Sequence, residues 1–250
     1  MNLVRTEGVV IRGYDFGEGH RIMVIFTQLL GKVRAVARGS RKTKSKFGAS
    51  LEPLSENHFI LYRKPGRPLF TITSCKIREP HSDLREDMNL YGYSSIMSEG
   101  VDLLHVEEDP DPVLYDLFSQ ALDDIKTEYP APVAWLFMFR LLKCAGYRLN
   151  FFSCADCGSK DLEKSEFSPE SGGLLCRQCR KTDDLRWPVS TDMIKAVKKL
   201  APDRELNLAV EREIGNIVIK FIKYQFGKEF KSLNFLNIFS KRKKACTFRN

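Results

Sequence analysis

The feature that most constrains this chain is two pairs of cysteines in its C-terminal half. Cys154 and Cys157 form one C-x2-C pair, and Cys176 and Cys179 form a second pair after 18 intervening residues. This spacing is typical of a four-thiolate zinc site, because a two-residue gap lets both sulfurs of a pair face one ion. Four thiolates leave no open position for water or substrate, so we predict one structural Zn²⁺ and no catalytic metal.

The residues around the cysteine pairs fit this interpretation. Gly158 permits a tight backbone turn after the first pair, and residues 168–173 predict a hairpin turn between the pairs. The other three cysteines, Cys75, Cys144 and Cys246, have no partner at ligand spacing. We predict Cys75 and Cys144 as small core residues. An odd number of cysteines with paired spacing argues against a disulfide framework.

The charge of the chain is divided into three blocks. The formal net charge is +8. Residues 1–80 hold 15 basic and 6 acidic residues, residues 81–130 hold 2 and 13, and residues 131–250 hold 23 and 13. The two basic blocks favour an anionic partner. Exposed helix ends and faces account for the acidic block, and docking of a basic partner is the alternative.

A stretch free of acidic residues lies inside the first block. No Asp or Glu occurs between Glu18 and Glu52, and half of the cations there fall within residues 41–46. Cations on a loop can follow a phosphate backbone and release its counterions, which gives binding without sequence preference. A solvated surface kept for solubility is the alternative explanation. The candidate nucleic-acid residues are Arg21, Lys32, Arg34, Arg38, Arg41, Lys42, Lys44 and Lys46.

Short β-branched and aromatic runs fill the first 80 residues, separated by Gly, Pro and polar turns. They predict five short strands, and tight turns with one long connection suit a small closed barrel. A five-stranded barrel with a cationic loop matches the way in which OB-folds hold single strands. Phe16, Phe26 and Phe47 are candidate stacking residues, although each also suits a core. The predicted runs are Val4, Val9–Ile11, Ile22–Phe26, Val33–Val36, Phe59–Tyr62 and Leu69–Ile77.

From about Asp83 the hydrophobic spacing becomes helical. Helices are predicted after the start signal at residues 109–112, over residues 132–145, after Ser190, and near residues 230–239. The predicted fold class is α+β with several domains: an N-terminal five-stranded OB-fold β-barrel at residues 1–80, followed by an α-helical domain at residues 81–250 with an inserted four-cysteine zinc module at residues 150–182.

Several classes of protein are disfavoured by what the sequence lacks. It contains no G-x4-G-K-[ST], H-E-x-x-H or G-x-S-x-G motif, and its four histidines are scattered. We therefore expect no enzymatic activity and no small-molecule substrate. The longest apolar run, residues 133–139, is too short for a membrane span, and no signal peptide is evident, so we expect a cytoplasmic protein without a membrane partner. The alternatives are a zinc-ribbon RNA-binding or transcription accessory protein and a metal-dependent nuclease.

Six short segments of the N-terminal region form a pattern specific to one family. They are Gly17-Glu18-Gly19-His20-Arg21-Ile22, Phe26-Thr27, Gly31-Lys32-Val33, Ala37-Arg38-Gly39-Ser40-Arg41-Lys42, Ser45-Lys46-Phe47-Gly48 and Leu51-Glu52-Pro53-Leu54. The order that follows also fits: helices, cysteine pairs inserted after Gly146-Tyr147, and helices that end in Lys231-Ser232-Leu233. On these residues the chain resembles, over essentially its whole length, the RecO family of bacterial DNA repair and recombination mediators.

The resemblance implies binding of single- and double-stranded DNA, annealing of complementary strands, and an OB-fold followed by a helical region with a zinc module. It also implies action with RecR and with the C-terminal tail of single-stranded DNA-binding protein (SSB), and indirectly with RecA, which is loaded onto SSB-coated DNA. The implied location is the bacterial cytoplasm, at the nucleoid. Six candidate cations lie in the matching segments, whereas Arg34 and Lys44 rest on the charge argument alone. Some members lack the zinc cysteines, so the metal is expected to stabilise this chain rather than define the family's activity.

Overall fold

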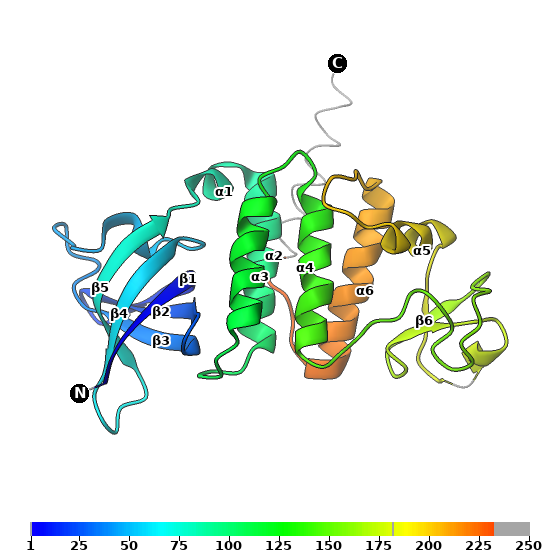
Figure 1. Cartoon of the computed structure of the whole chain (residues 1–250), viewed down its shortest axis with the longest axis horizontal. Helices are drawn as coiled ribbons and strands as arrows, with labels where there is room; N and C mark the ends of the chain where they lie inside the picture. The colour runs from blue at the N-terminus through cyan, green and yellow to red at the C-terminus, as the bar shows by residue number, and fades with distance from the viewer. Residues whose placement is uncertain (1, 182, 233–250) are drawn as a thin grey trace, which may run out of the picture. The chain divides into compact units, whose positions relative to one another are not determined.

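The structure, a computed structural model, describes residues 2–181 and 183–232 of the 250-residue chain. The chain divides into two compact units, one ending at Lys126 and the other beginning at Thr127. Figure 1 shows the elements of both units. Most of the helix predicted near residues 230–239 and the whole basic segment 241–244 lie outside the described residues.

Five strands of the first unit form a closed barrel in the order β1-β2-β3-β5-β4. β1 is long because it pairs with two strands: its first half pairs with β4 and its second half pairs with β2. A register shift between Val10 and Arg12 bends the strand between these pairings. The predicted runs at Val4 and Val9–Ile11 are therefore one strand. The strands are β1 (Asn2–Phe16), β2 (His20–Thr27), β3 (Gly31–Ala37), β4 (Glu56–Arg63) and β5 (Phe70–Glu79).

The barrel closes where β3 runs parallel to β5, with Ala35 opposite Phe70. The long connection between β3 and β4 carries a short 3-10 helix, η1 (Gly48–Leu51), and it buries Phe47 and Leu51 in the barrel core. A five-stranded barrel with this strand order, in which β1 lies between β2 and β4, is an OB-fold. The predicted fold of the N-terminal region is thus confirmed.

Three helices follow the barrel within the first unit: α1 (Ser82–Glu86), α2 (Met88–Leu104) and α3 (Pro112–Asp124). The Asp87 carboxylate accepts hydrogen bonds from the N–H groups of Asn89 and Leu90 at the start of α2, and Asp111 accepts one from Leu114 at the start of α3. These caps satisfy backbone donors that have no partner inside the helix, and Pro in the first turn favours helical φ. The predicted start signal before α3 is confirmed.

Helix α3 packs on the outside of the barrel. Phe26 of β2 is buried, and its ring centroid lies 6.1 Å from that of Tyr115. The buried carboxylate of Glu56, at the start of β4, accepts hydrogen bonds from Tyr115 Oη at 2.6 Å and Ser119 Oγ at 3.0 Å. Arg78 Nη1 lies 2.6 Å from the same carboxylate. Burial and the hydrogen bond to Glu56 raise the pKa of Tyr115, so its hydroxyl remains a donor.

The second unit combines three helices with a small sheet of order β7-β6-β8. α4 and α6 approach closely because Gly215 has no side chain: a Cβ there would lie 2.9 Å from the Trp135 ring. The Ser190 hydroxyl accepts a hydrogen bond from the Met193 N–H, which confirms the helix start predicted there. The elements are α4 (Pro130–Cys144), β6 (Glu166–Ser168), β7 (Gly173–Leu175), η2 (Cys179–Lys181), β8 (Trp187–Pro188), α5 (Thr191–Lys198) and α6 (Leu208–Phe226).

The predicted fold class is confirmed: the chain is α+β, with an N-terminal OB-fold barrel, helices and a four-cysteine module. The predicted domain boundaries, at residues 80, 150 and 182, stay predictions. The boundary between the two compact units falls elsewhere in the sequence, after Lys126, because α2 and α3 belong to the same unit as the barrel. The prediction that Cys144 is a core residue is wrong, since it is exposed in the last turn of α4. Within residues 2–181 and 183–232, every helix is too short or too polar to cross a membrane.

Candidate metal centre and nucleic-acid interface

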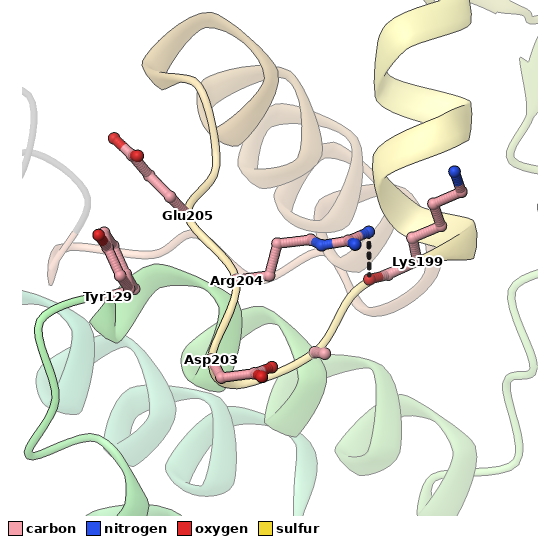
Figure 2. A pocket seen from close by; sticks show the side chains of 6 residues that line it. Tyr129, Lys199, Asp203, Arg204 and Glu205 are labelled. Carbon is pink, nitrogen blue, oxygen red and sulfur yellow. Dashed lines mark hydrogen bonds between the residues drawn. The ribbon is translucent and has the colours of Figure 1, made fainter.

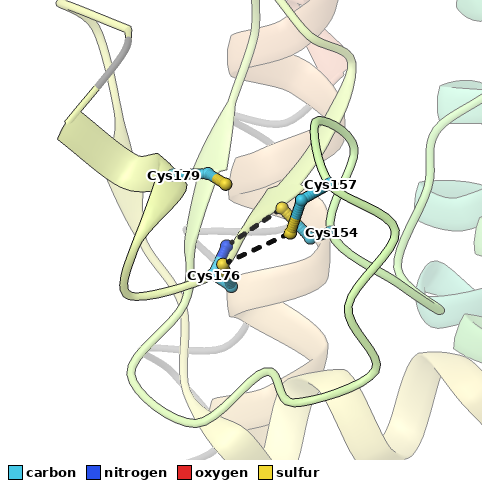
Figure 3. Close-up of side chains that lie close together, drawn as sticks. All are labelled: Cys154, Cys157, Cys176 and Cys179. Carbon is cyan, nitrogen blue, oxygen red and sulfur yellow. Dashed lines mark hydrogen bonds between the residues drawn. The ribbon is translucent and has the colours of Figure 1, made fainter.

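The four paired cysteines converge in the second unit. Cys154 and Cys157 lie in the loop before β6, Cys176 follows β7 directly, and Cys179 begins η2. Their four Sγ atoms all lie within 4.8 Å of one another, and Cys157 Sγ is 3.8 Å from Cys176 Sγ. Figure 3 shows the four side chains turned toward a common centre.

Two similar turns hold the cysteine pairs. The Gly158 N–H donates to the Cys154 carbonyl at 3.0 Å, and the Arg180 N–H donates to the Cys176 carbonyl at 2.9 Å. Gly158 has φ of +74°, a left-handed conformation that glycine adopts without strain. The hairpin predicted between the pairs is present, because β6 and β7 pair antiparallel with Ser168 opposite Gly173.

The cluster favours thiolate at one of its sulfurs. Burial raises the pKa of the Cys154 thiol, but N–H donors from Cys176, Cys157 and Asp156 outweigh burial and lower that pKa to about 6. The Cys176 N–H lies 3.4 Å from Cys154 Sγ. Hydrogen bonding to Asp156 and to Cys157 raises the pKa of Cys179. Thiolate is the form that ligates a metal ion.

The geometry fits a metal ion bound by four sulfurs. A tetrahedral site with metal–sulfur bonds of about 2.3 Å has sulfur–sulfur edges of about 3.8 Å, close to the separation of Cys157 and Cys176. These four cysteines could hold a metal ion. With all four positions filled by protein, such an ion would support the fold rather than bind a substrate.

Aromatic rings connect the four-cysteine module to the helices of its unit. Phe167 of β6 stacks on Trp187 at 5.7 Å and on Phe151 at 5.5 Å, and it meets Phe221 of α6 edge-on at 6.1 Å. This cluster of aromatic rings explains why a sheet of three very short strands is ordered, since such a sheet buries little surface by itself. Phe152, the chain neighbour of Phe151, is 60% exposed.

The basic segment between β3 and η1 is hydrogen-bonded to the turn between β1 and β2. The Gly39 N–H donates to His20 Nδ1 at 2.9 Å, and the Arg41 N–H donates to the Gly19 carbonyl at 3.3 Å. We call residues 38–46 the basic loop. Because its backbone is bound at two points, its cations are held at one end of the barrel.

The basic loop exposes most of its cations. Arg38, Lys42 and Lys44 are exposed, and the described part of the chain offers them no ion-pair partner. Arg41 lies 3.4 Å from the exposed carboxylate of Asp15. Lys46 is exposed and donates to the Thr73 carbonyl at 2.7 Å. Arg21, on β2, lies 3.7 Å from Asp15.

Lys32 and Arg34 of β3 are paired with carboxylates of α2 and of the connection that follows it. Lys32 is only 6% exposed, and its Nζ lies 3.5 Å from Asp102 Oδ1. Burial lowers the pKa of Lys32, and Asp102 opposes that shift. Arg34 is exposed, but its Nη2 lies 2.6 Å from the Glu107 carboxylate. A phosphate could reach either cation only in competition with a carboxylate of the same chain.

The candidate stacking residues separate by burial. Phe26 and Phe47 are buried, whereas Phe16 at the end of β1 is 47% exposed. Tyr14, which the sequence did not single out, is 38% exposed on the same strand and lies 5.8 Å from the Arg12 guanidinium. Alternation along β1 was the available signal for Tyr14, because residues 14 and 16 of a strand share a face.

A pocket in the second unit lies between the start of α4 and the connection from α5 to α6. It is lined by Tyr129, Lys199, Ala201, Asp203, Arg204 and Glu205. Figure 2 shows Arg204 donating to the Lys199 carbonyl, at 3.5 Å. Its two cations and two carboxylates balance, so its charge favours neither an anion nor a cation.

Comparison with known proteins covers nearly the whole chain. The family model for the N-terminal domain of recombination protein O matches residues 1–81, and the model for its C-terminal domain matches residues 85–234. A DNA repair protein RecO from Acetivibrio thermocellus is 30% identical over 245 residues, covering 94% of this chain and 97% of the relative. One from Bifidobacterium animalis is 32% identical over 243 residues, covering 95% and 100%. One from Alkaliphilus metalliredigens is 32% identical over 206 residues, covering 81% and 83%.

Proposed function

The chain belongs to the family of DNA repair protein RecO, and we propose that it is a recombination mediator that binds single- and double-stranded DNA and anneals complementary strands. The observation that carries the proposal is the basic loop: Arg38, Lys42 and Lys44 are exposed on a backbone bound to the β1–β2 turn. Anchored cations bind phosphate at a smaller entropic cost than cations on a free loop.

The proposed activity requires no covalent step, and we propose no enzymatic role. Cations of the basic loop neutralise phosphates of two strands, which lowers the repulsion between the strands and lets complementary bases pair. The proposed contact residues are Arg21, Arg38, Arg41, Lys42, Lys44 and Lys46. Lys32 and Arg34 stay predictions whose carboxylate partners would first have to separate.

The proposed protein partners follow from family membership. We propose that the chain acts with RecR, binds the C-terminal tail of SSB, and thereby helps to load RecA onto SSB-coated single strands in the bacterial cytoplasm, at the nucleoid. Contact with SSB would direct annealing to DNA that is already covered. A generic basic protein would lack this property, because the coat would block it.

We further propose that the four-cysteine site binds one Zn²⁺ with a structural role. Support comes from the four-sulfur donor set, whose Sγ atoms all lie within 4.8 Å of one another. Cys154, Cys157, Cys176 and Cys179 would hold the ion, which would tie the two turns of the module together. The rings that stack on Phe167 would then pack against a rigid module.

Annealing of complementary strands coated with SSB tests the proposed function. A mediator should anneal coated strands at a rate comparable to bare strands, whereas complete inhibition by SSB would favour a generic RNA- or DNA-binding protein. Labelled DNA incubated with the protein and Mg²⁺ or Mn²⁺ provides the second measurement. Strand loss in proportion to the protein would contradict a role without catalysis.

A further inference from the structure

The last turn of α2 and the connection from α2 to α3 place three carboxylates against four cations of the barrel. Asp102 Oδ2 lies 2.7 Å from Arg12 Nε, and Asp102 Oδ1 lies 3.5 Å from Lys32 Nζ. Glu107 pairs with Arg34 at 2.6 Å, and Glu108 accepts from Arg63 Nη1 through both oxygens, at 2.6 and 2.7 Å. We call Asp102, Glu107 and Glu108 the acidic corner.

The backbone holds the acidic corner firmly in this place. Glu107 forms a parallel bridge with Lys32, and the Glu108 N–H donates to the Lys32 carbonyl at 2.8 Å. Glu108 has φ of +59°, which costs energy for a residue with a side chain and persists only where the surrounding structure imposes it. The corner is therefore attached to β3 by backbone contacts as well as by charge.

The two ends of the barrel differ in how their cations are occupied. Arg34 of β3 and Arg63 at the end of β4 each have a carboxylate of the acidic corner at 2.6 Å. At the basic loop, Arg41 has the exposed carboxylate of Asp15 at 3.4 Å, whereas Arg38 and Lys42 are exposed and have no acid within ion-pair distance among the described residues. A carboxylate held on a cation occupies the position that a phosphate oxygen would take.

We propose that the acidic corner sets the boundary of the nucleic-acid surface. Glu107 and Glu108 occupy Arg34 and Arg63, so a strand binds at the basic loop and does not extend over β3 and β4. This inference rests on the proposed function, because it concerns the path of the bound strand. Glu107 and Glu108 are thus positioning residues that limit how many phosphates the barrel neutralises.

The energetics allow this boundary to be removed by substitution. The Arg34–Glu107 and Arg63–Glu108 pairs are partly exposed, and pairs of this kind contribute about 0–1 kcal/mol to stability. The double variant Glu107→Gln, Glu108→Gln should therefore fold while releasing two cations. Each additional phosphate contact to a single strand steepens the salt dependence of the binding constant by about 0.7 in log–log units.

Salt titration of single-strand binding is the test. Two new contacts would steepen the slope by about 1.4, so the loss of affinity between 50 and 200 mM salt should become about sevenfold larger than in the parent. Replacing Arg34 and Arg63 by Ala in the same variant should reverse the gain. In the parent background, those alanines should leave the slope nearly unchanged.

The matched control is Glu86→Gln with Asp124→Asn, which changes the net charge equally within the same unit. Both side chains are exposed, and neither is paired with a barrel cation among the described residues. A control slope that rises as much as that of the corner variant would overturn the inference. A parent that binds single strands without salt dependence would instead refute the proposed function, so the two failures are distinguishable.

Discussion

Gly31→Ala should destabilise the barrel unit much more than the same change at another left-handed glycine. Gly31 has φ of +64°, and a Cβ there would lie 2.0 Å from the carbonyl oxygen and 2.6 Å from the carbonyl carbon of Asp109. Both atoms belong to the backbone, so the clash cannot be relieved by the rotation of a flexible side chain. The α2–α3 turn would have to shift, which would strain the hydrogen bond from Glu108 to Lys32.

The magnitude follows from three contributions. Alanine in a left-handed conformation costs about 1–2 kcal/mol. Overpacking against fixed atoms costs about 1–3 kcal/mol, and a lost backbone hydrogen bond costs about 0.5–1.5 kcal/mol. Gly66 is the matched control, because it has φ of +74° and a Cβ at that position would meet no atom within 4 Å beyond its chain neighbours. The left-handed cost is common to both variants, so the difference between them should be about 1.5–4.5 kcal/mol, the sum of the overpacking and hydrogen-bond contributions.

The assay must report on the barrel unit. Trp135 and Trp187 both lie in the second unit, so tryptophan fluorescence would not detect the change. Amide hydrogen exchange of β2 and β3, followed by mass spectrometry in the native state, measures the free energy of opening directly. Equal loss of protection in Gly31→Ala and Gly66→Ala would refute the claim that the α2–α3 turn is fixed against the barrel.

Three further predictions concern binding, metal and pH. Replacing Arg41, Lys42 and Lys44 by Ala should flatten the salt dependence of single-strand binding by up to about 0.7 per lost contact, and an unchanged slope would return the basic loop to a solvated surface. Cys176→Ser should lower zinc content and melting temperature together; full stability with no bound zinc would contradict the metal site. Burial lowers the pKa of His81, so the unfolded chain binds a proton more readily and stability should fall as pH drops below about 6.5. In His81→Asn that decline, measured by urea unfolding across pH 5–7, should become shallower, and an identical decline would exclude His81 as its source.

The parts of the structure that depend on neighbouring residues could be predicted from the sequence. The cysteine pairs come together because each turn is specified by a two-residue gap, and Ser190 and Asp111 mark helix starts through hydrogen bonds to residues three positions away. The strand runs of the barrel were predictable from β-branched and aromatic residues. Two of those runs proved to be one strand, because a bulge leaves the backbone continuous.

The pairing of distant charges could not be predicted. Lys32 and Asp102 are 70 positions apart, and only the packing of α2 on the barrel brings them together. The sequence shows a basic block followed by an acidic block, which is compatible with neutralisation between them but does not indicate which cations are occupied. Phe47 illustrates the same limit, since a loop aromatic beside cations suits stacking or core equally well until the chain is folded.

The double pairing of β1 has a consequence for the order in which the chain acquires structure during synthesis. The half of β1 that pairs with β2 meets its partner within about 20 residues, but the other half waits for β4, which ends at Arg63. At about 5–20 residues per second, the 36 residues between Thr27 and Arg63 take about 2–7 seconds to be added. During that interval the first residues of the nascent chain form an open strand edge, so co-translational pairing with another chain is a hazard at the N-terminus.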